Sequence, residues 1–247
     1  MPNTPYLDAS VRWKIRSGLT HSSEPRYREM AATLLDSGLA TEVLRKIGSG
    51  KEADVYLCRD GGRLQAVKVY RTYRTSHRVA RNMKLDEIGH LAAWEYDMLV
   101  YAYRDGAPVP RPGRRDENAF SMQYLGSLEG SAPQLREIVG EDLGELAEKT
   151  FRAVERLAEA GVVHTDLSPF NVLIDGGEPY IIDVGSCLRV DRLGSPPWLT
   201  AFRAREALQA GAGHLARFFS DRGTDVDLDE FVGRLMGRID RFGILDG

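Results

Sequence analysis

The sequence has few cysteines and no long apolar run. Its 247 residues include two cysteines, Cys58 and Cys187, which are far apart and lack the spacing of a zinc site. No stretch of about 18 apolar residues occurs, and the first residues lack the apolar core of a signal peptide. These absences exclude a disulfide-stapled domain, a cysteine zinc site and a membrane-spanning helix. We therefore expect a soluble, cytoplasmic protein with no membrane partner.

The sequence also lacks an excess of charge of one sign. It has 33 basic and 36 acidic residues and a net charge of −3, so no overall positive field indicates a nucleic-acid-binding protein. Residues 61–85 are the local exception, because they include no acidic residue. An anionic partner such as RNA or a phosphoprotein would explain them, but we favour a solvated linker that leads into a helix. The basic residues of this segment are Arg63, Lys68, Arg71, Arg74, Arg78, Arg81 and Lys84.

The most informative stretch runs from residue 162 to residue 187. It predicts an apolar strand, a polar loop, a short strand, a turn at residues 175–177 and a second strand that ends at Asp183. This pattern brings Asp166, Asn171 and Asp183 to the ends of strands. Phosphoryl transfer needs one carboxylate to accept a hydroxyl proton, and an amide with a second carboxylate to hold Mg²⁺. The spacing H-x-D-x-x-x-x-N followed by a hairpin and Asp is typical of protein kinases, although an ordinary polar hairpin loop is the alternative. We expect His164 to brace this loop by hydrogen bonding.

A glycine-containing turn and a lysine-bearing strand come earlier in the chain. Three short strands are predicted between residues 41 and 70, and Gly48 and Gly50 lie in the first turn. Glycine lets backbone N–H groups approach a polyphosphate closely, although most such turns are ordinary hairpins. Lys68 lies on the third strand, where kinases place the lysine that contacts phosphate. Ala53 stands where the usual kinase loop has a third glycine, so this loop should be stiffer.

A helix is predicted from Asp86, as its cap, to about Tyr103. Glu95 falls within the apolar stripe of this helix instead of on its polar face. A carboxylate that faces a core needs a cation, and Lys68 is the natural partner. The pattern thus predicts a Lys68–Glu95 ion pair, with a tolerated boundary glutamate as the alternative.

Weaker patterns fill the rest of the chain. A short helix is predicted from Tyr27 to Gly38, an extended connector at residues 108–112, a strand at residues 119–124 and a helix over residues 143–158. Three helical patterns follow Asp183, near residues 199–208, 215–219 and 227–236. Thr165 replaces the arginine of the H-R-D motif and no A-P-E sequence is present, so no activation-loop switch is expected.

Together these residues resemble the RIO family of atypical serine/threonine protein kinases, in the branch without a full N-terminal winged helix. The resemblance rests on IGSGKEADVY, AVKVYRT, VVHTDLSPFNVLI and YIIDVGSC and covers residues 40–237. It implies an α+β, two-lobed protein-kinase-like fold. The expected divisions are an arm and short helix at residues 1–40, an N-lobe of antiparallel sheet plus one helix at 41–124, and a compact, mainly helical C-lobe lacking a full activation segment at 125–247.

The resemblance also implies a function. It implies serine/threonine protein kinase activity on a protein substrate with ATP and Mg²⁺, or Mn²⁺ in its place, and autophosphorylation and ATPase turnover through an aspartyl-phosphate at Asp183. Asp166, Asp183, Lys68 and Glu95 would be the catalytic residues, and Asn171 and Asp183 the metal ligands. ATP would be bound by Ile47, Gly48, Ser49, Gly50, Lys51, Glu52, Ala53, Val55, Ala66, Lys68, Met122, Tyr124, Leu125, Leu173 and Ile182.

Two other functions stay open. A small-molecule phosphotransferase of the aminoglycoside-kinase type also uses H-x-D-x-x-x-x-N, but the chain after Asp183 is too short to build its substrate pocket. A nucleotide-gated binding module in ribosome assembly would instead bind a ribosomal subunit or ribosomal RNA. The sequence names neither the substrate nor an oligomeric state.

Overall fold

The computed structural model describes residues 27–50, 52–70, 85–140, 143–191 and 196–242. The chain divides into two compact units. Unit 1 comprises Met1–Tyr96 and Pro112–Tyr124, and unit 2 comprises Asp97–Arg111 and Leu125–Gly247. Within the described ranges, every helix is too short or too polar to cross a lipid bilayer.

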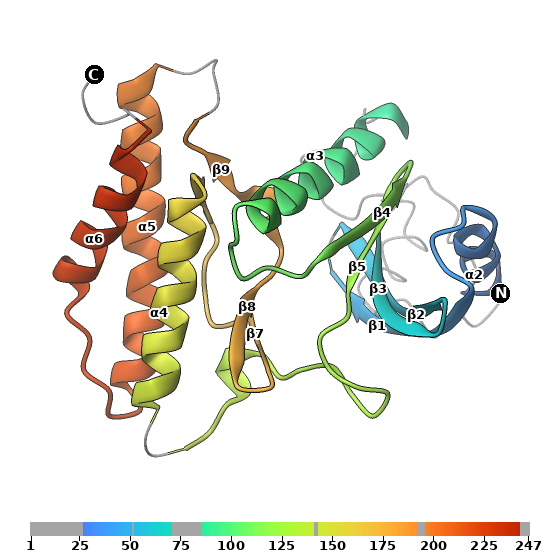
Figure 1. Ribbon diagram of the computed structural model, residues 1–247, viewed down its shortest axis with the longest axis horizontal. Helices are drawn as coiled ribbons and strands as arrows, with labels where there is room; N and C mark the ends of the chain where they lie inside the picture. Colours follow the sequence, from blue (N-terminus) through green and yellow to red (C-terminus); the bar gives the residue numbers. More distant parts are fainter. Residues whose placement is uncertain (1–26, 51, 71–84, 141–142, 192–195, 243–247) are drawn as a thin grey trace, which may run out of the picture. The chain divides into compact units, whose positions relative to one another are not determined.

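Unit 1 is built on a five-stranded antiparallel sheet with the order β1-β2-β3-β5-β4 (Figure 1). The three strands predicted before residue 70 are confirmed, and Gly38 follows the helix that ends at Asp36 with a φ of 68°, a conformation that favours glycine. The elements are α2 (Tyr27–Asp36), β1 (Glu42–Ser49), β2 (Ala53–Asp60), β3 (Arg63–Tyr70), α3 (Leu85–Arg104), β4 (Pro112–Asp116) and β5 (Ala119–Gln123).

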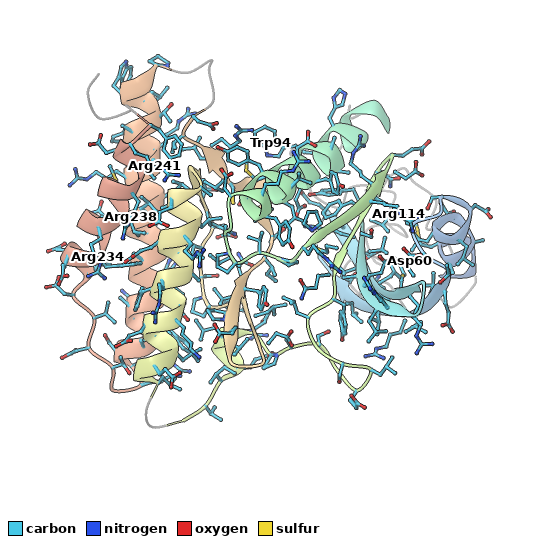
Figure 2. All side chains as sticks on the ribbon, viewed as in Figure 1. Asp60, Trp94, Arg114, Arg234, Arg238 and Arg241 are labelled. Atoms are coloured by element: carbon cyan, nitrogen blue, oxygen red, sulfur yellow. The ribbon has the colours of Figure 1, made fainter. Side chains whose placement is uncertain are left out.

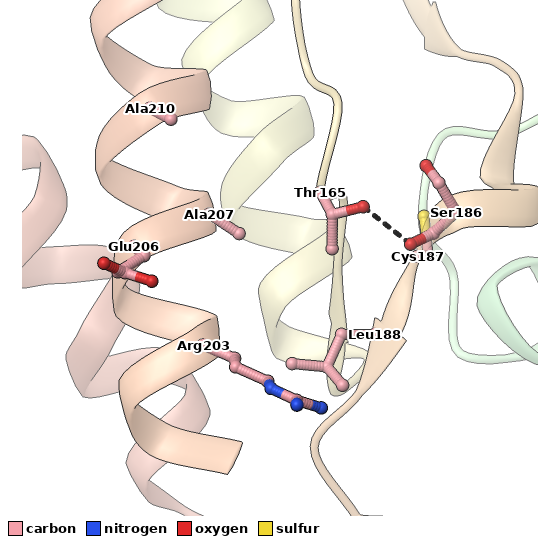
Figure 3. Close-up of a pocket in the computed structure, with 8 residues that line it drawn as sticks. All are labelled: Thr165, Ser186, Cys187, Leu188, Arg203, Glu206, Ala207 and Ala210. Atoms are coloured by element: carbon pink, nitrogen blue, oxygen red, sulfur yellow. Dashed lines mark hydrogen bonds between the residues drawn. The ribbon is translucent and has the colours of Figure 1, made fainter. Parts of the chain in front are cut away.

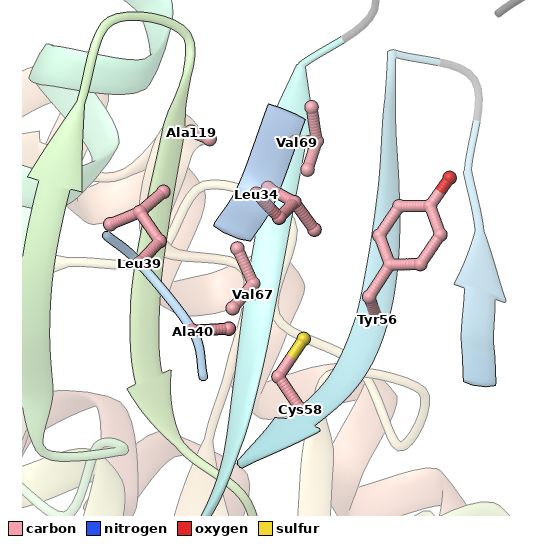
Figure 4. Close-up of a cluster of buried hydrophobic side chains, with 8 residues drawn as sticks. All are labelled: Leu34, Leu39, Ala40, Tyr56, Cys58, Val67, Val69 and Ala119. Atoms are coloured by element: carbon pink, nitrogen blue, oxygen red, sulfur yellow. The ribbon is translucent and has the colours of Figure 1, made fainter. Parts of the chain in front are cut away.

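The helix α2 packs on one face of this sheet. Its Leu34 side chain lies in a buried cluster with Val67 and Val69 of β3 (Figure 4). Alternate residues of a strand point to opposite faces, so these two valines share a face. Burial in this cluster raises the pKa of the Cys58 thiol to about 12, which makes it a structural residue. The other members are Leu39, Ala40, Tyr56 and Ala119.

The opposite face of the sheet carries Lys68 and receives α3. Lys68 pairs with Phe120 in the antiparallel register, so both side chains lie on the same face. The Tyr96 ring of α3 contacts the Phe120 ring there, with 5.8 Å between the ring centroids. This packing places the middle of α3 over β3, where its polar side chains can reach Lys68.

Two details of unit 1 differ from the sequence prediction. Pro112 was expected in a connector but begins β4, and it is tolerated because β4 is the edge strand of the sheet. The strand is polar and exposed after Pro112, so it lacks the alternating pattern that would have revealed it. Asp86 was expected to cap α3, but the helix already begins at Leu85.

The described part of unit 2 contains the end of α3, three further α-helices and two short two-stranded ribbons (Figure 1). β6 pairs with β9, and β7 pairs with β8 in the hairpin predicted around the turn at residues 175–177. The elements are η1 (Leu135–Glu137), α4 (Gly144–Glu159), β6 (Val162–Val163), β7 (Val172–Asp175), β8 (Glu178–Ile181), η2 (Val184–Ser186), β9 (Leu188–Arg189), α5 (Pro197–Ser220) and α6 (Leu228–Asp240).

The helices of unit 2 pack through aromatic side chains. Phe151 of α4 meets Phe231 of α6 edge to face at 4.5 Å and Phe219 of α5 at 5.7 Å between ring centroids. Burying one such side chain stabilises the fold by about 1.5–3 kcal/mol. Arg234 and Arg238 of α6, labelled in Figure 2, also bind Glu155 of α4 at 3.1 and 3.5 Å. These exposed ion pairs add less than about 1 kcal/mol each, so the aromatic contacts dominate.

The end of the chain has two helices where the sequence predicts three. The patterns near residues 199–208 and 215–219 belong to one continuous helix, α5, although Gly211 and Gly213 lie between them. A Cβ atom at Gly211 would lie 2.7 Å from the Leu167 Cβ atom, so this glycine allows close packing and does not break the helix. The two-residue strand β9 was also missed because it is too short to show a pattern.

Candidate active site

In unit 2, the loop from His164 to Asn171 connects β6 to β7, and we call it the catalytic loop. The hairpin β7–β8 then returns the chain beside this loop, because the Ile182 N–H donates to the Asn171 carbonyl at 3.0 Å. The next residue is Asp183. The Asn171 side-chain amide also donates to the Asp166 carbonyl at 2.7 Å. These hydrogen bonds bring the three predicted polar residues into one region of unit 2.

His164 links the two ends of this arrangement. Its Nε2–H donates to the Ile182 carbonyl at 3.1 Å, and its Nδ1 accepts from the Asp166 N–H at 3.2 Å. The ring must be neutral to do both, because Nδ1 accepts only when it carries no proton. His164 is buried, and this burial lowers its pKa below the ordinary value of 6.5 against the opposing effects of the Ile182 carbonyl and the nearby carboxylates. The side chain therefore braces the loop, as predicted.

This brace should make stability depend on pH. The folded state favours neutral His164, so its contribution is complete above the unfolded pKa of about 6.5. As the pH falls below 6.5, the unfolded chain gains a proton before the folded protein does, and stability declines. Urea unfolding between pH 7.5 and 5 should show a steeper loss for the unchanged protein than for His164→Asn. His90→Asn, at an exposed position of α3, is the control and should keep the original slope.

Asp183 has an unusual backbone conformation. Its φ and ψ are 61° and 51°, the left-handed region that residues other than glycine rarely adopt. Such strain, of order 1–3 kcal/mol, persists where the surroundings fix it, and it concentrates at functional sites. The following turn η2 is tied to the catalytic loop, since the Thr165 hydroxyl donates to the Ser186 carbonyl at 2.7 Å. Thr165 therefore has a structural role at the position of the arginine in the H-R-D motif.

The helix α5 holds the catalytic loop from the other side. Leu167, the residue after Asp166, is buried against Gly211 at the close approach described above. The His214 ring donates from Nδ1 to the Leu167 carbonyl at 3.0 Å. Both contacts fix the backbone next to Asp166.

Phe170 of the catalytic loop, whose role the sequence leaves uninterpreted, stacks with an arginine. The Arg136 guanidinium lies 4.5 Å from the centre of the Phe170 ring, and the Arg136 N–H donates to the Pro169 carbonyl at 3.2 Å. The segment around η1 thus supports the loop before Asn171.

In unit 1, the predicted ion pair between Lys68 and Glu95 is present. The Lys68 Nζ lies 2.7 Å from the Glu95 carboxylate, which is only 3% exposed. The Tyr70 hydroxyl donates to the same carboxylate, and the Lys68 ammonium lies 5.4 Å from the Tyr70 ring centre. Glu95 therefore holds the Lys68 side chain at a fixed position on the sheet face.

The glycine-containing turn is held by a buried carboxylate that the sequence did not reveal. Asp54 accepts from the Ser49 hydroxyl at 2.9 Å and pairs with the Lys46 Nζ at 2.8 Å. The Gly50 N–H donates to the Ala53 carbonyl at 2.9 Å. These bonds fix the base of the turn. Lys51 lies outside the described residues, and Glu52 is exposed.

Several predicted nucleotide-contacting side chains meet on the sheet face that carries Lys68. Ala66 and Tyr124 are buried in one cluster with Leu57, and Ile47, Val55 and Met122 pack against it. Apolar side chains of this kind suit the faces of an adenine ring. Three further residues predicted to contact ATP, Leu125, Leu173 and Ile182, lie in unit 2. The Leu125 carbonyl accepts from the Ala132 N–H, and Leu173 forms an isolated β-bridge with Gln134. The Ile182 carbonyl contacts His164.

The oxygen donors of unit 2 fit Mg²⁺. The Asn171 amide nitrogen is used by the Asp166 carbonyl, which leaves the amide oxygen for another partner. Mg²⁺ prefers such oxygen ligands and binds through one or two carboxylates together with substrate phosphates. The described residues contain no cluster of three or more His, Cys, Asp or Glu, so a metal cage made by the protein alone is not indicated there.

Sequence reasoning missed several supporting residues. Tyr70 could have been found, because it lies two residues after Lys68 on the same strand and so faces the same side. Asp54, Gly211 and His214 gave no signal, because their partners are set by packing between distant segments.

Comparison with known proteins identifies the family. The profile of the RIO domain matches residues 54–231. RIO-type serine/threonine-protein kinase Rio1 of Haloferax volcanii is 32% identical over 203 residues, which cover 75% of this chain and 67% of that protein. Serine/threonine-protein kinase RIO1 is 27% identical in Caenorhabditis elegans and 28% in humans, and the matches cover 82% and 68% of this chain. The same matches span only 42% of the C. elegans protein and 33% of the human protein, which are longer than this chain.

A solved structure is similar in fold. The Rio2 kinase–ADP/Mg²⁺–phosphoaspartate complex from Chaetomium thermophilum has a TM-score of 0.62 and 21% identity, over 94% of this chain and 79% of that one. This likeness confirms the protein-kinase-like fold, with an antiparallel N-terminal sheet and a helical C-terminal part. Because the family profile covers more than half of the chain, this protein belongs to the RIO family of atypical serine/threonine protein kinases.

Proposed function

We propose that this protein is an ATP- and Mg²⁺-dependent serine/threonine protein kinase of the RIO type. The observation that carries the proposal is the hydrogen-bonded arrangement of Asp166, Asn171 and the strained Asp183 in unit 2. The buried Lys68–Glu95 pair of unit 1 supports it. Relatives that share the RIO domain carry the same kinase description.

Each of these residues has a distinct proposed role. Asp166 orients the acceptor hydroxyl and takes its proton, which is the task of a general base. Asn171 and Asp183 hold Mg²⁺, which neutralises phosphate charge when it is bound. Lys68 contacts the phosphates, and Glu95 positions Lys68. Ile47, Val55, Ala66, Met122 and Tyr124 accommodate the base, and the backbone of residues 48–53 approaches the phosphates.

We further propose that Asp183 is itself phosphorylated. The related Rio2 kinase was solved with a phosphoaspartate, ADP and Mg²⁺. A carboxylate oxygen of Asp183 would bond to the γ-phosphorus, the bond from that phosphorus to the bridging oxygen would break, and ADP would leave with the bonding electrons. Water would then attack the phosphorus of the acyl phosphate, release inorganic phosphate and regenerate the Asp183 carboxylate. Turnover would resemble that of an ATPase.

The test is to incubate the purified protein with γ-labelled ATP and Mg²⁺. Label that hydroxylamine removes, and that is absent from Asp183→Ala, is expected for an aspartyl-phosphate. Acid-stable label on serine or threonine is expected for protein kinase activity. ATP consumption that requires small amino-sugars, with no labelled protein, would contradict the proposal and support the aminoglycoside-type alternative.

A ribosomal subunit or ribosomal RNA is a further proposed partner. It rests on the basic residues Arg74, Arg78 and Arg81, which lie outside the described residues. Reversing all three to glutamate should weaken RNA binding and flatten its dependence on salt concentration. Unchanged, salt-dependent binding by the variant would contradict this partner. Both cysteines are buried thiols, which fits the reducing cytoplasm proposed for the protein.

A further inference from the structure

Unit 2 contains an open pocket beside the catalytic loop (Figure 3). Its volume is about 490 Å³, which is enough for a few side chains of a bound peptide. One wall comes from the catalytic loop and the segment after Asp183, and the other comes from α5. The lining residues are Thr165, Ser186, Cys187, Leu188, Arg203, Glu206, Ala207 and Ala210.

The position of this pocket suits an acceptor substrate. Thr165 in its wall immediately precedes Asp166, the proposed base. Chain bound against Thr165 would therefore lie next to the group that must reach the acceptor hydroxyl. Ala207 and Ala210 give the α5 wall small side chains, so a peptide backbone can approach the helix closely.

Two charged side chains line the pocket. Arg203 and Glu206 are exposed, and neither forms an ion pair or hydrogen bond with the part of the chain that the structure describes. Figure 3 shows the Arg203 side chain extending from α5 toward Leu188. An arginine directed along a pocket wall is suited to a carboxylate, which it can bind through two parallel hydrogen bonds.

Exposed aromatic side chains continue this surface along α5. Trp198 is 62% exposed and Phe202 is 56% exposed, and their spacing of four residues places them on the same side of the helix. Phe202 directly precedes Arg203. Tryptophan and arginine are the residues that most often dominate binding at protein interfaces, and neighbouring exposed aromatics mark such surfaces.

We propose that this pocket docks the acceptor segment of a protein substrate, and that Arg203 pairs with an acidic side chain close to the acceptor serine or threonine. Trp198 and Phe202 contact the apolar part of the same segment. Glu206, one turn further along α5, disfavours a second acidic residue at its own position and so sets the register. This inference rests on the proposed kinase function and adds a substrate class to it.

The test uses two acceptor peptides that differ at a single position, two residues away from the acceptor serine. One peptide carries aspartate at this position and the other carries lysine. The unchanged protein should prefer the aspartate peptide. Arg203→Glu should lower kcat/KM for that peptide about tenfold, because two negative charges then face each other, and should leave the KM for ATP unchanged. The control is Arg205→Glu, a charge reversal at an exposed α5 position that does not line the pocket.

A second variant tests the pocket independently of charge. Ala210→Phe places a ring in the pocket from an exposed position, so the fold should tolerate it, and the KM for both peptides should rise. Docking is overturned if Arg203→Glu behaves like Arg205→Glu, or if Ala210→Phe leaves the KM values of both peptides unaltered. If the unchanged protein transfers no phosphate in an Asp166-dependent manner, the proposed kinase function itself fails.

Discussion

Replacing Asp166 with alanine is expected to lower the rate of phosphoryl transfer by about 10³-fold while the affinity for ATP stays nearly unchanged. The base acts on the acceptor and not on the nucleotide, so its loss should appear in kcat. In the catalytic loop, the Asp166 backbone donates from its N–H to His164 and accepts at its carbonyl from Asn171. Truncating the carboxylate leaves these hydrogen bonds in place. Single-turnover transfer and calorimetric ATP binding measure the two quantities separately.

Asp183→Ala is the informative comparison. It removes a proposed metal ligand and phosphate acceptor, so transfer should be abolished and the affinity for ATP–Mg²⁺ should also fall. Asp175→Ala is the matched control, because Asp175 ends β7 in the same hairpin and has no proposed role. It should retain transfer close to that of the unchanged protein. Retained turnover in both Asp166→Ala and Asp183→Ala would refute the assignment of the site.

Glu95→Ala should have the largest effect on stability, a loss of about 3 kcal/mol in the free energy of unfolding. The substitution removes the carboxylate that compensates the Lys68 charge and accepts from the Tyr70 hydroxyl. Glu95 is almost fully buried, so water cannot replace the lost carboxylate without opening the core. The midpoint of urea unfolding measures this change, and transfer activity should fall as Lys68 loses its fixed position.

An exposed ion pair of the same sheet provides the control. Glu42 pairs with Arg59 at 3.0 Å, but both side chains are largely in water. Glu42→Ala should therefore cost less than about 1 kcal/mol. Equal losses for Glu95→Ala and Glu42→Ala would show that burial of the Lys68–Glu95 pair contributes nothing. Glu95→Gln keeps the shape of the side chain, so its loss of stability measures the charge together with one lost hydrogen-bond acceptor.

The sequence was sufficient to predict those features of the structure that depend on neighbouring residues. The hairpin around residues 175–177 follows from its turn residues, and the Lys68–Glu95 pair follows from a carboxylate on an apolar helix stripe. The spacing from Asp166 to Asn171 then gave the chemistry without any knowledge of packing. These features depend on residues within one turn or one helix of each other, or on a single pairing of charges.

The sequence was insufficient to predict those features that depend on contacts between distant segments of the chain. Pro112 suggested a connector, but pairing with β5 makes it the start of an edge strand. The patterns near residues 199–208 and 215–219 suggested two helices, but they form one helix, and the missing side chain of Gly211 makes room for Leu167, 44 positions earlier in the chain. The pocket beside Thr165 also gave no signal, since its two walls come from separate parts of the sequence.

The unbroken course of α5 has a mechanical consequence. Its N-terminal half lines the pocket at Arg203, and its next turns hold Leu167 through Gly211 and His214. Arg203 and His214 are eleven residues apart, which corresponds to about 16 Å along one stiff rod. Any ligand that tilts or turns this rod must also displace the backbone next to Asp166. Binding of a ligand in the pocket would thus change the position of Asp166 through the helix. Hydrogen exchange at the amides of the catalytic loop would detect this change.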